Sequence, residues 1–373
     1  MESNNFRILH SLLFKNNIPF AAYRLPGEAT IKTIINAEKQ PDTITLPDIS
    51  NDTTGFIFAP FDQDGACPAF LFHADKTAVS GNISRNLIEE ISHIRYPSVS
   101  DMSHENIIIR KDDHIKIIEK TIENITSGTF RKAILSRVEQ INDISGVSVI
   151  DFFLHAAGAY PKAFTYLVNI PGHGIWTGAS PELLVKMDNE IIETNALAGT
   201  LPFDKENPEN VAWQKKERDE QKIVADYVED TLKQLHIIDY QKTGPYTSNA
   251  GNVVHLKTRY VIKKRLFNGN AGDLLCSFHP TPSVCGFPKE TARQYIRKTE
   301  PHDREYYTGF LGPMNIQGST SIYVNLRCMK IASGSAWLFA GGGITEDSNP
   351  ENEWTETEMK LHTLLSILKK IRT

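Results

Sequence analysis

The sequence predicts an antiparallel-rich α+β fold. Strand-like segments come in hairpin-like groups, and long helical segments separate the groups instead of following every strand. No Gly/Ser-rich linker, low-complexity tract or short-period repeat marks a division into modules. The 373 residues are also enough to bury a large core.

The elements are expected from apolar periodicity and from the turn residues between them. The first 105 residues are predicted to contain short mixed elements, namely helices over 6–14 and 87–94 and strands over 55–60 and 69–73. An amphipathic helix over 106–126 follows and ends near Ser127-Gly128. Next come a strand over 132–141, a helix over 149–157, and strands over 164–169, 174–178, 183–187 and 191–198.

The second half is also predicted to contain long helices between groups of strands. A long helix over 207–235 precedes strand-like segments at 253–256 and 260–262. A short helix over 289–298 is followed by strands over 307–312, 321–331 and 336–340, and a final helix over 349–371.

Composition narrows the possible partners and the compartment. The net charge of −5 gives no indication of nucleic-acid binding. The four cysteines form no CxxC pair, which favours reduced core residues over disulfides or zinc ligands. No segment reads as a signal peptide or a membrane span. We therefore expect a cytoplasmic protein with no nucleic-acid or membrane partner, and a monomer because no coiled coil or long exposed edge is apparent.

Charged residues interrupt the apolar face of the final helix. At ~100° per residue, Glu353 and Lys360 fall inside the apolar arc and Glu356 lies at its edge. Their spacing of i, i+3 and i+7 directs all three the same way. The alternative is a solvated charge cluster in the first turn, where the helix dipole favours glutamate.

A second helix shows the same pattern. Glu220 sits within the apolar stripe of the 207–235 helix, and Glu217 lies one turn before it on the same side. Buried carboxylates are usually paired, protonated or bound to a metal. Two helices that direct glutamates inward favour Mg²⁺, which needs few protein ligands. The alternative is a buried network of glutamates with lysine or arginine.

Nine motifs in a fixed order then give a resemblance. They are Lys132-Ala-Ile-Leu-Ser-Arg137, Gly178-Ala-Ser-Pro-Glu182, Leu197-Ala-Gly199-Thr200, Glu217-Arg-Asp-Glu220, His279-Pro-Thr-Pro with Gly286-Phe-Pro, Asp303-Arg-Glu-Tyr-Tyr307, Arg327-Cys, Ala340-Gly-Gly-Gly343, and Glu353-Trp-Thr-Glu356 with Lys360. In these motifs the chain resembles the chorismate-utilising enzymes, and specifically the isochorismate synthases. The resemblance covers 106–373, the expected chorismate-binding catalytic region, and 1–105 is expected to be a less distinctive part of the same fold. It implies one large domain with an antiparallel β-sandwich core flanked by helices, and an active site between the sheets.

The resemblance also implies a reaction. Water adds at ring C2 of chorismate while the C4 hydroxyl leaves as water, which gives isochorismate for menaquinone or siderophore biosynthesis. Lys132 would be the base and Glu182 the acid. A lysine base must be neutral and a glutamate acid must be protonated, so both need a suitable environment. Without the resemblance, Lys132 reads as a surface lysine at a strand end and Glu182 as a first-turn helix residue.

The implied metal ligands are the inward glutamates. Glu220 and Glu356 would hold Mg²⁺, with Glu217 and Glu353 acting in a second shell or through water. The metal would bind the ring carboxylate of chorismate and offset its charge.

The resemblance also implies which residues of the motifs bind the substrate. Arg327, expected in the middle of a strand, suits bidentate recognition of the second carboxylate, and Tyr307 adds a hydroxyl. Backbone amides of Gly341, Gly342 and Gly343 would form an anion-binding nest, although a tight turn or bulge is the alternative. Lys360 adds positive charge and Gly199 belongs to the same expected site. His279 either supports its loop or faces the leaving hydroxyl.

Two departures from related ammonia-using enzymes favour water as the nucleophile. Ala198 stands where the aminodeoxychorismate branch carries lysine, and Gly286-Phe-Pro-Lys289 replaces the usual Gly-Ala-Pro-Lys. A salicylate synthase, which goes on to eliminate pyruvate, remains an alternative. A non-catalytic chorismate-binding protein is a second one, although Lys132, Glu182 and the glutamates are all present.

Overall fold

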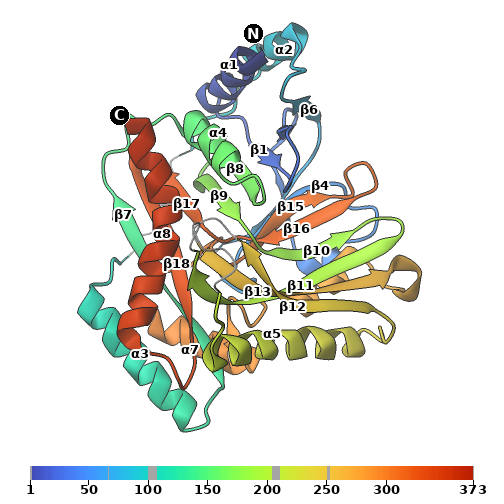
Figure 1. The fold of residues 1–373 in the computed structure, drawn as a ribbon. Helices are drawn as coiled ribbons and strands as arrows, with labels where there is room; N and C mark the ends of the chain where they lie inside the picture. The colour runs from blue at the N-terminus through green and yellow to red at the C-terminus, as the bar shows by residue number, and fades with distance from the viewer. Residues whose placement is uncertain (1, 66, 100–106, 204–210, 250–252, 373) are drawn as a thin grey trace.

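Two large antiparallel sheets form the protein, which confirms the predicted α+β class (Figure 1). The computed structural model describes residues 2–65, 67–99, 107–203, 211–249 and 253–372. Within these residues each sheet contains nine strands. The first sheet has the order β14-β7-β18-β17-β9-β8-β1-β2-β6, and the second has the order β12-β13-β11-β10-β16-β15-β4-β5-β3.

The strands of the first sheet come from all parts of the chain. They are β1 (Phe20–Arg24), β2 (Lys32–Ile35), β6 (Lys76–Val79), β7 (Lys132–Ile141), β8 (Phe164–Ile170), β9 (Gly174–Ser180), β14 (Gly286–Phe287), β17 (Cys328–Ala332) and β18 (Ser335–Ile344). The longest pairing in this sheet joins β7 to β18, with Ile134 opposite Gly343 and Ser136 opposite Gly341. This pairing brings the Lys132 strand next to the glycine-rich strand.

The second sheet is equally mixed in sequence. Its strands are β3 (Asp42–Ile44), β4 (Gly55–Ala59), β5 (Ala69–Phe72), β10 (Leu183–Met187), β11 (Ile191–Pro202), β12 (Gln241–Asn249), β13 (Val253–Lys263), β15 (Phe310–Met314) and β16 (Thr320–Val324). Residues before 106 thus supply three strands to each sheet, so they are integral to the fold.

Helices cover the outer faces of both sheets (Figure 1). Apolar side chains of α5 (Lys215–Gln234) and α6 (Ala271–Phe278) pack on the second sheet. Those of α4 (Val149–Ala159) and α8 (Pro350–Arg372) pack on β17 and β18. The remaining helices are α1 (Glu2–Lys15), α2 (Arg85–His93), α3 (Lys111–Thr126), α7 (Lys289–Thr299) and the short η1 (Leu46–Asp48) and η2 (Lys264–Leu266).

The space between the sheets is filled with aromatic side chains. Trp176 and Tyr306 meet edge to face with 5.5 Å between ring centroids, and Phe58 stacks on Tyr306 at 4.2 Å. Aromatic rings in such contacts bury much apolar area and hold a defined geometry. This rigid core fixes the two sheets against each other and so positions the strand ends that carry the site.

Most predicted elements are present, with informative differences. The predicted 321–331 strand is wrong, because it is divided into β16 and β17 at Arg327, whose backbone is left-handed with φ of +48°. The segments at 253–256 and 260–262 form one strand, β13. The helix predicted from 207 begins at Lys215, and the one predicted from 106 begins at Lys111; residues 204–210 and 100–106 lie outside the described part.

Two further expectations concern the surroundings of the chain. In the described residues, no helix combines the length and the apolar character needed to cross a membrane. Cys67, Cys285 and Cys328 are buried and carry no disulfide, whereas Cys276 is exposed. Burial raises the pKa of the Cys67 thiol to about 12, so that it stays a neutral core group.

Candidate active site

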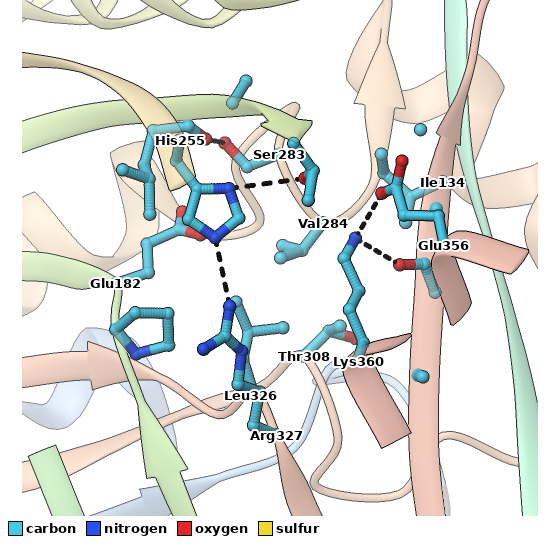
Figure 2. A pocket seen from close by; sticks show the side chains of 18 of the residues that line it. Ile134, Glu182, His255, Ser283, Val284, Thr308, Leu326, Arg327, Glu356 and Lys360 are labelled. Atoms are coloured by element: carbon cyan, nitrogen blue, oxygen red, sulfur yellow. Dashed lines mark hydrogen bonds and ion pairs between the residues drawn. The ribbon is translucent and has the colours of Figure 1, made fainter. Parts of the chain in front are cut away.

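A pocket lies where the two sheets meet the beginnings of α5 and α8. Both sheets contribute to its wall, together with the loop before β14 and the links before β10 and β17. Figure 2 shows Glu182, His255 and Arg327 on one side and Glu356 and Lys360 on the other. The remaining lining residues are Ile134, Pro181, Leu197, Ala198, Gly199, Thr200, Glu220, Ser283, Val284, Tyr307, Thr308, Leu326, Phe339, Ala340, Gly341, Gly342 and Gly343.

Lys132 begins β7 and is completely buried. Its Nζ lies 2.9 Å from Oε1 of Glu220, in an ion pair that lacks hydrogen-bond alignment. It stands behind Glu220 rather than among the lining residues of the pocket. The interpretation as a surface lysine is therefore wrong, because the side chain is not exposed. A buried ammonium needs a charged partner, and Glu220 is that partner.

Glu182 lies in the short link between β9 and β10 and not in a helix. Only 4% of the residue is exposed. Burial raises the pKa of its carboxyl to about 7, although the positive charges of Lys132 and Lys360 act in the opposite direction. A carboxyl with this pKa is substantially protonated near neutral pH, as a general acid must be.

Each of three inward glutamates has its own lysine. Glu220 pairs with Lys132, Glu356 Oε1 lies 2.7 Å from Lys360 Nζ, and Oε1 of Glu353 is in close contact with the ammonium of Lys216. The side chains of Glu220 and Glu356 are 13% and 16% exposed, and the Glu353 side chain is 2% exposed. The reading of Glu353 as a solvated first-turn residue is therefore wrong.

The charges of these groups depend on one another. Burial disfavours the ionised form of Glu220, but the ammonium of Lys132 outweighs it and lowers the pKa. Burial raises the pKa of Glu353 to about 7, and the negative charge of Glu356 adds to this. Glutamate carboxyl groups and lysine side chains are thus paired across this part of the site.

The carboxylates fit a divalent cation bound by few protein ligands. Oε2 of Glu353 is buried and has no hydrogen-bond partner, which leaves one ligand oxygen unsatisfied. Within the described residues no three His, Cys, Asp or Glu side chains form a ready-made metal cage. Mg²⁺ does not require one, because it keeps several waters and takes other ligands from its substrate.

Glu217 has a different position. Its Oε2 accepts a hydrogen bond from the backbone N–H of Gln214 at 3.0 Å, within a capping box at the start of α5. It does not line the pocket. Its contribution to the site in the structure is to begin the helix that presents Glu220.

The three glycines of β18 make room for the charged groups. A Cβ on Gly343 would lie 2.4 Å from Oε1 of Glu220, and one on Gly342 would lie 3.2 Å from Oε2 of Glu353. A Cβ on Gly341 would lie 3.0 Å from the hydroxyl oxygen of Tyr307. None of the three has a positive φ, and all are extended residues paired with β7. The alternative of a tight turn or bulge is therefore wrong, and the binding of an anion by these backbone amides stays a prediction.

Arg327 reaches the pocket from the break between β16 and β17. Its left-handed backbone ends the strand and turns the buried guanidinium inward, where Nη2 lies 3.1 Å from Nε2 of His255. Burial lowers the pKa of Arg327 to about 10, which still leaves it charged at neutral pH. A charged guanidinium in a pocket is a suitable partner for a carboxylate.

Sequence reasoning missed His255. Its Nδ1 lies 3.0 Å from the carbonyl oxygen of Gly199, so Nδ1 carries the proton and Nε2 accepts from Arg327. Burial lowers the pKa of His255 to about 3, and the charges of Arg327 and Lys360 add to this, so the ring is neutral. Gly199 sits at a bulge in β11 with φ of +70°, which turns its carbonyl toward the ring.

The remaining expected residues divide into two groups. Tyr307 lines the pocket and stacks on Phe339, and Lys360 donates to the carbonyl oxygen of Gly341 at 2.7 Å. His279 lies away from the pocket, where its Nε2 donates to the carbonyl oxygen of Phe61 at 3.1 Å. Of the two roles considered for His279, the structure therefore favours support of its loop.

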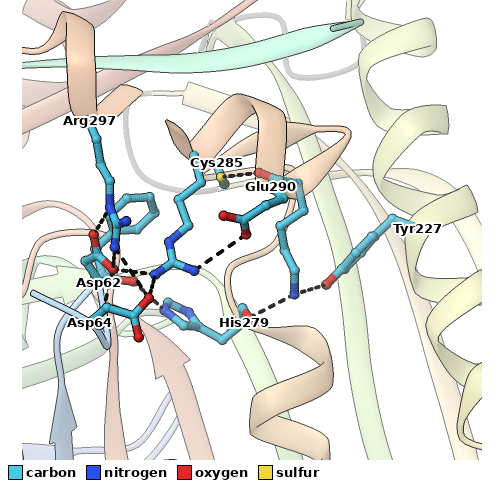
Figure 3. A network of polar contacts seen from close by, with 10 residues as sticks. Asp62, Asp64, Tyr227, His279, Cys285, Glu290 and Arg297 are labelled. Carbon is cyan, nitrogen blue, oxygen red and sulfur yellow. Dashed lines mark hydrogen bonds and ion pairs between the residues drawn. The ribbon is translucent and has the colours of Figure 1, made fainter. Parts of the chain in front are cut away.

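The surroundings of His279 explain this support role (Figure 3). Its carbonyl oxygen accepts from Lys289 at 3.1 Å, and Lys289 also contacts the hydroxyl of Tyr227. Nearby, Arg293 and Arg297 of α7 pair with Asp62. These contacts hold the loop before β14 over the pocket from outside.

The fold and the pocket together define an enzyme-like site, in which a buried carboxyl, a buried guanidinium and paired glutamates and lysines surround one pocket. Residues 70–369 match the family described as chorismate binding enzyme. The chain therefore belongs to the chorismate-binding enzyme family.

Individual relatives agree with this assignment. The chain is 31% identical over 242 residues to isochorismate synthase EntC of Escherichia coli, which covers 63% of this chain and 62% of EntC. It is 29% identical over 276 residues to isochorismate synthase DhbC of Bacillus subtilis, covering 70% and 69%. It is also 30% identical to anthranilate synthase component 1 of Streptomyces coelicolor, covering 68% and 50%. The match to EntC thus spans less than two thirds of that protein.

Solved structures share the fold over nearly the whole chain. DhbC of Bacillus anthracis has a TM-score of 0.78 at 22% identity and covers 98% of this chain and 99% of its own. Anthranilate synthase component I of Streptococcus pneumoniae has a TM-score of 0.67 at 20% identity, with coverage of 92% and 89%. The single-domain β-sandwich architecture expected from the motifs is confirmed.

Proposed function

We propose that the protein is a Mg²⁺-dependent isochorismate synthase, which isomerises chorismate by moving a hydroxyl from C4 to C2. The single observation that carries this is a buried pair of acid–base groups: Glu182 in the wall of the pocket and Lys132 in contact with the wall residue Glu220. Burial raises the pKa of Glu182 to about 7, and Lys132 lies buried beside the carboxylate of Glu220. Relatives named isochorismate synthase support the reaction.

In this reaction Lys132 must first lose the proton that its ion pair with Glu220 holds, and it then takes a proton from the water whose oxygen bonds to C2. Both ring double bonds shift, from C1=C2 to C1=C6 and from C5=C6 to C4=C5, the C4–O bond breaks, and Glu182 gives its proton to the departing hydroxyl, which leaves as water. One water enters and one leaves, so the reaction is an isomerisation without redox change. Ala198, a small residue in the pocket wall, leaves space for the attacking water.

Binding of the substrate falls to the cationic groups. Arg327 would hold the enolpyruvyl carboxylate, with the hydroxyl of Tyr307 as a further donor. Glu220 and Glu356, with Glu353 behind them, would hold Mg²⁺ beside Gly342 and Gly343. When bound there, the cation neutralises the ring carboxylate and orients the ring.

The test is to incubate purified protein with chorismate and either Mg²⁺ or EDTA, and to identify products by chromatography and mass spectrometry. Isochorismate at equilibrium with chorismate, lost with EDTA, is the expected result. Accumulation of salicylate and pyruvate would instead identify a salicylate synthase. The absence of any product with water or ammonia would contradict an enzymatic function and favour a chorismate-binding protein.

A further inference from the structure

Lys216 has no role in the reaction above, yet it reaches the carboxylate edge of the site. It lies in the first turn of α5, and its side chain is 24% exposed. Its ammonium contacts Oε1 of Glu353, a residue of α8 that is 137 positions later in the chain. A long flexible side chain that is ordered inward loses conformational entropy, so the interaction with Glu353 must compensate for this loss.

The neighbouring residue Lys215 shows that the inward orientation is particular to the side chain of Lys216. Lys215 precedes Lys216 and its side chain is 79% exposed. Its Nζ lies 3.5 Å from Asp219 and 3.9 Å from Asp347, both on the outer surface. Consecutive helical residues point about 100° apart, so only one of the two lysines is directed at the site.

Lys216 contacts Glu353 directly and also lies within the electric field of Glu220 and Glu356. Burial disfavours its charged form, but the negative charges of Glu353, Glu220 and Glu356 outweigh this and raise its pKa. An ammonium in this position therefore neutralises part of the negative charge that would attract a divalent cation.

Glu353 is the carboxylate that Lys216 restrains. Its Oε1 contacts the ammonium of Lys216. Its buried Oε2 has no hydrogen-bond partner and lies next to Gly342. Without the lysine, both oxygens would be available to a cation, and the cation would then be the charge that favours the ionised form of this buried carboxyl. A third strong ligand would then adjoin Glu220 and Glu356.

We propose that Lys216 is a built-in competitor of the metal: it restrains Glu353 and keeps the affinity of the carboxylate site for Mg²⁺ low until the substrate carboxylate completes it. This inference rests on the proposed function for the identity of the cation. Its consequence is that Mg²⁺ and substrate bind cooperatively, because each supplies charge that the other needs.

The test uses the full chain and MgCl₂ as the probe, without chorismate, followed by isothermal titration calorimetry. Lys216→Met keeps the apolar stem and removes the charge, so we expect Mg²⁺ to bind about tenfold more tightly than to the wild type. Lys215→Met removes the same charge one residue away and should change the affinity less than twofold. Thermal unfolding of each variant shows whether it is folded.

The role of Glu353 is tested in the same titration. Glu353→Gln combined with Lys216→Met should abolish the gain, because the released carboxylate is then neutral. Unchanged or weaker Mg²⁺ binding by folded Lys216→Met would overturn the proposal, and so would an equal gain in Lys215→Met. If the wild type and Lys216→Met both fail to titrate, the proposal is also overturned.

A separate product assay distinguishes this proposal from the proposed function. If the wild type forms isochorismate and Lys216→Met shows no gain in Mg²⁺ affinity, only the role of Lys216 fails. If the gain is found and the wild type leaves chorismate unchanged, the competitor role stands and the isochorismate synthase assignment fails.

Discussion

Lys132 and Glu220 form a buried ion pair, with 2.9 Å between Nζ of the lysine and Oε1 of the glutamate. The proposed base and a proposed metal ligand therefore contact each other directly. A change in the charge of one alters the environment of the other, so the proton-transfer and cation-binding parts of the site are expected to be coupled.

Replacement of Lys132 by alanine should abolish turnover and leave chorismate binding largely intact. General-base catalysis contributes about 10²–10⁴-fold to a rate, so kcat should fall by about 10³-fold. The affinity measured by calorimetry should change only a few-fold, because Arg327 and the carboxylate edge remain. Lys116→Ala, at a side chain that is 71% exposed, is the matched control. A Lys132→Ala variant with wild-type activity would rule out this base.

The stability of the protein should fall as the pH rises through about 7, partly because of Glu182. Its pKa is raised from 4.5 to about 7 by burial, so the folded state holds a proton that the unfolded state has released. The stabilisation from this proton is complete below pH 4.5 and is lost as pH rises through 7. Glu182→Gln cannot ionise and should not lose it.

Urea unfolding of both proteins at pH 5.5 and pH 8.5 measures this difference. Relative to the wild type, Glu182→Gln should gain on the order of 2 kcal/mol between the two pH values. The same variant should have almost no activity, since an amide cannot donate the proton required by the leaving hydroxyl. A difference that does not vary with pH would show that Glu182 is ionised throughout.

His255 should affect substrate affinity more than turnover. Loss of its Nε2 removes the acceptor that holds the guanidinium of Arg327 in place. His255→Ala should therefore raise the KM for chorismate about tenfold, with a smaller change in kcat. His255→Gln offers an amide oxygen to Arg327 and should recover part of the loss. A fall in kcat alone, without recovery by glutamine, would indicate that the ring acts directly in the chemistry.

Gly343→Ala should impair the cation site without unfolding the protein. The added Cβ would lie 2.4 Å from Oε1 of Glu220 and 3.1 Å from Cε of Lys132, so the flexible carboxylate must move. The backbone is not strained, because Gly343 does not have a positive φ. We expect a melting temperature within a few degrees of wild type and a roughly tenfold higher Mg²⁺ requirement for activity.

The control for this variant is Gly158→Ala in α4. No atom lies within 4 Å of the added Cβ there, and alanine favours the helix by about 0.5–1 kcal/mol. Gly158→Ala should therefore keep full activity at the wild-type Mg²⁺ requirement. If Gly343→Ala behaves in the same way, Glu220 has room that the structure does not show.

Much of the fold followed from local patterns. The bounds predicted for the Lys132 strand match β7, because turn residues flank this segment on both sides. Helical periodicity likewise identified Glu353 as an inward residue, since the position of a side chain around a helix depends only on its spacing. Short strands such as β1 and β2 were missed, because they are defined by partners far away in the chain.

The parts of the site that could not be predicted depend on contacts between distant segments. His255 lies in an apolar strand, and its partner Arg327 is 72 positions later. A polar residue within an apolar run was the one available signal, and it does not identify the partner. The left-handed backbone of Arg327 was also invisible, because non-glycine residues seldom adopt it and the sequence around it continues the strand pattern.

The pairing of β7 with β18 has a consequence for synthesis on the ribosome. Lys132 emerges some two hundred residues before its neighbours Gly343 and Glu356, as their positions in the chain show. Until β18 has been translated, the apolar edge of β7 has no partner on that side, and such unpaired edges invite aggregation. We therefore expect nascent chains that end before β18 to be inactive and to depend on chaperones, and the site to form only in the last stage of translation.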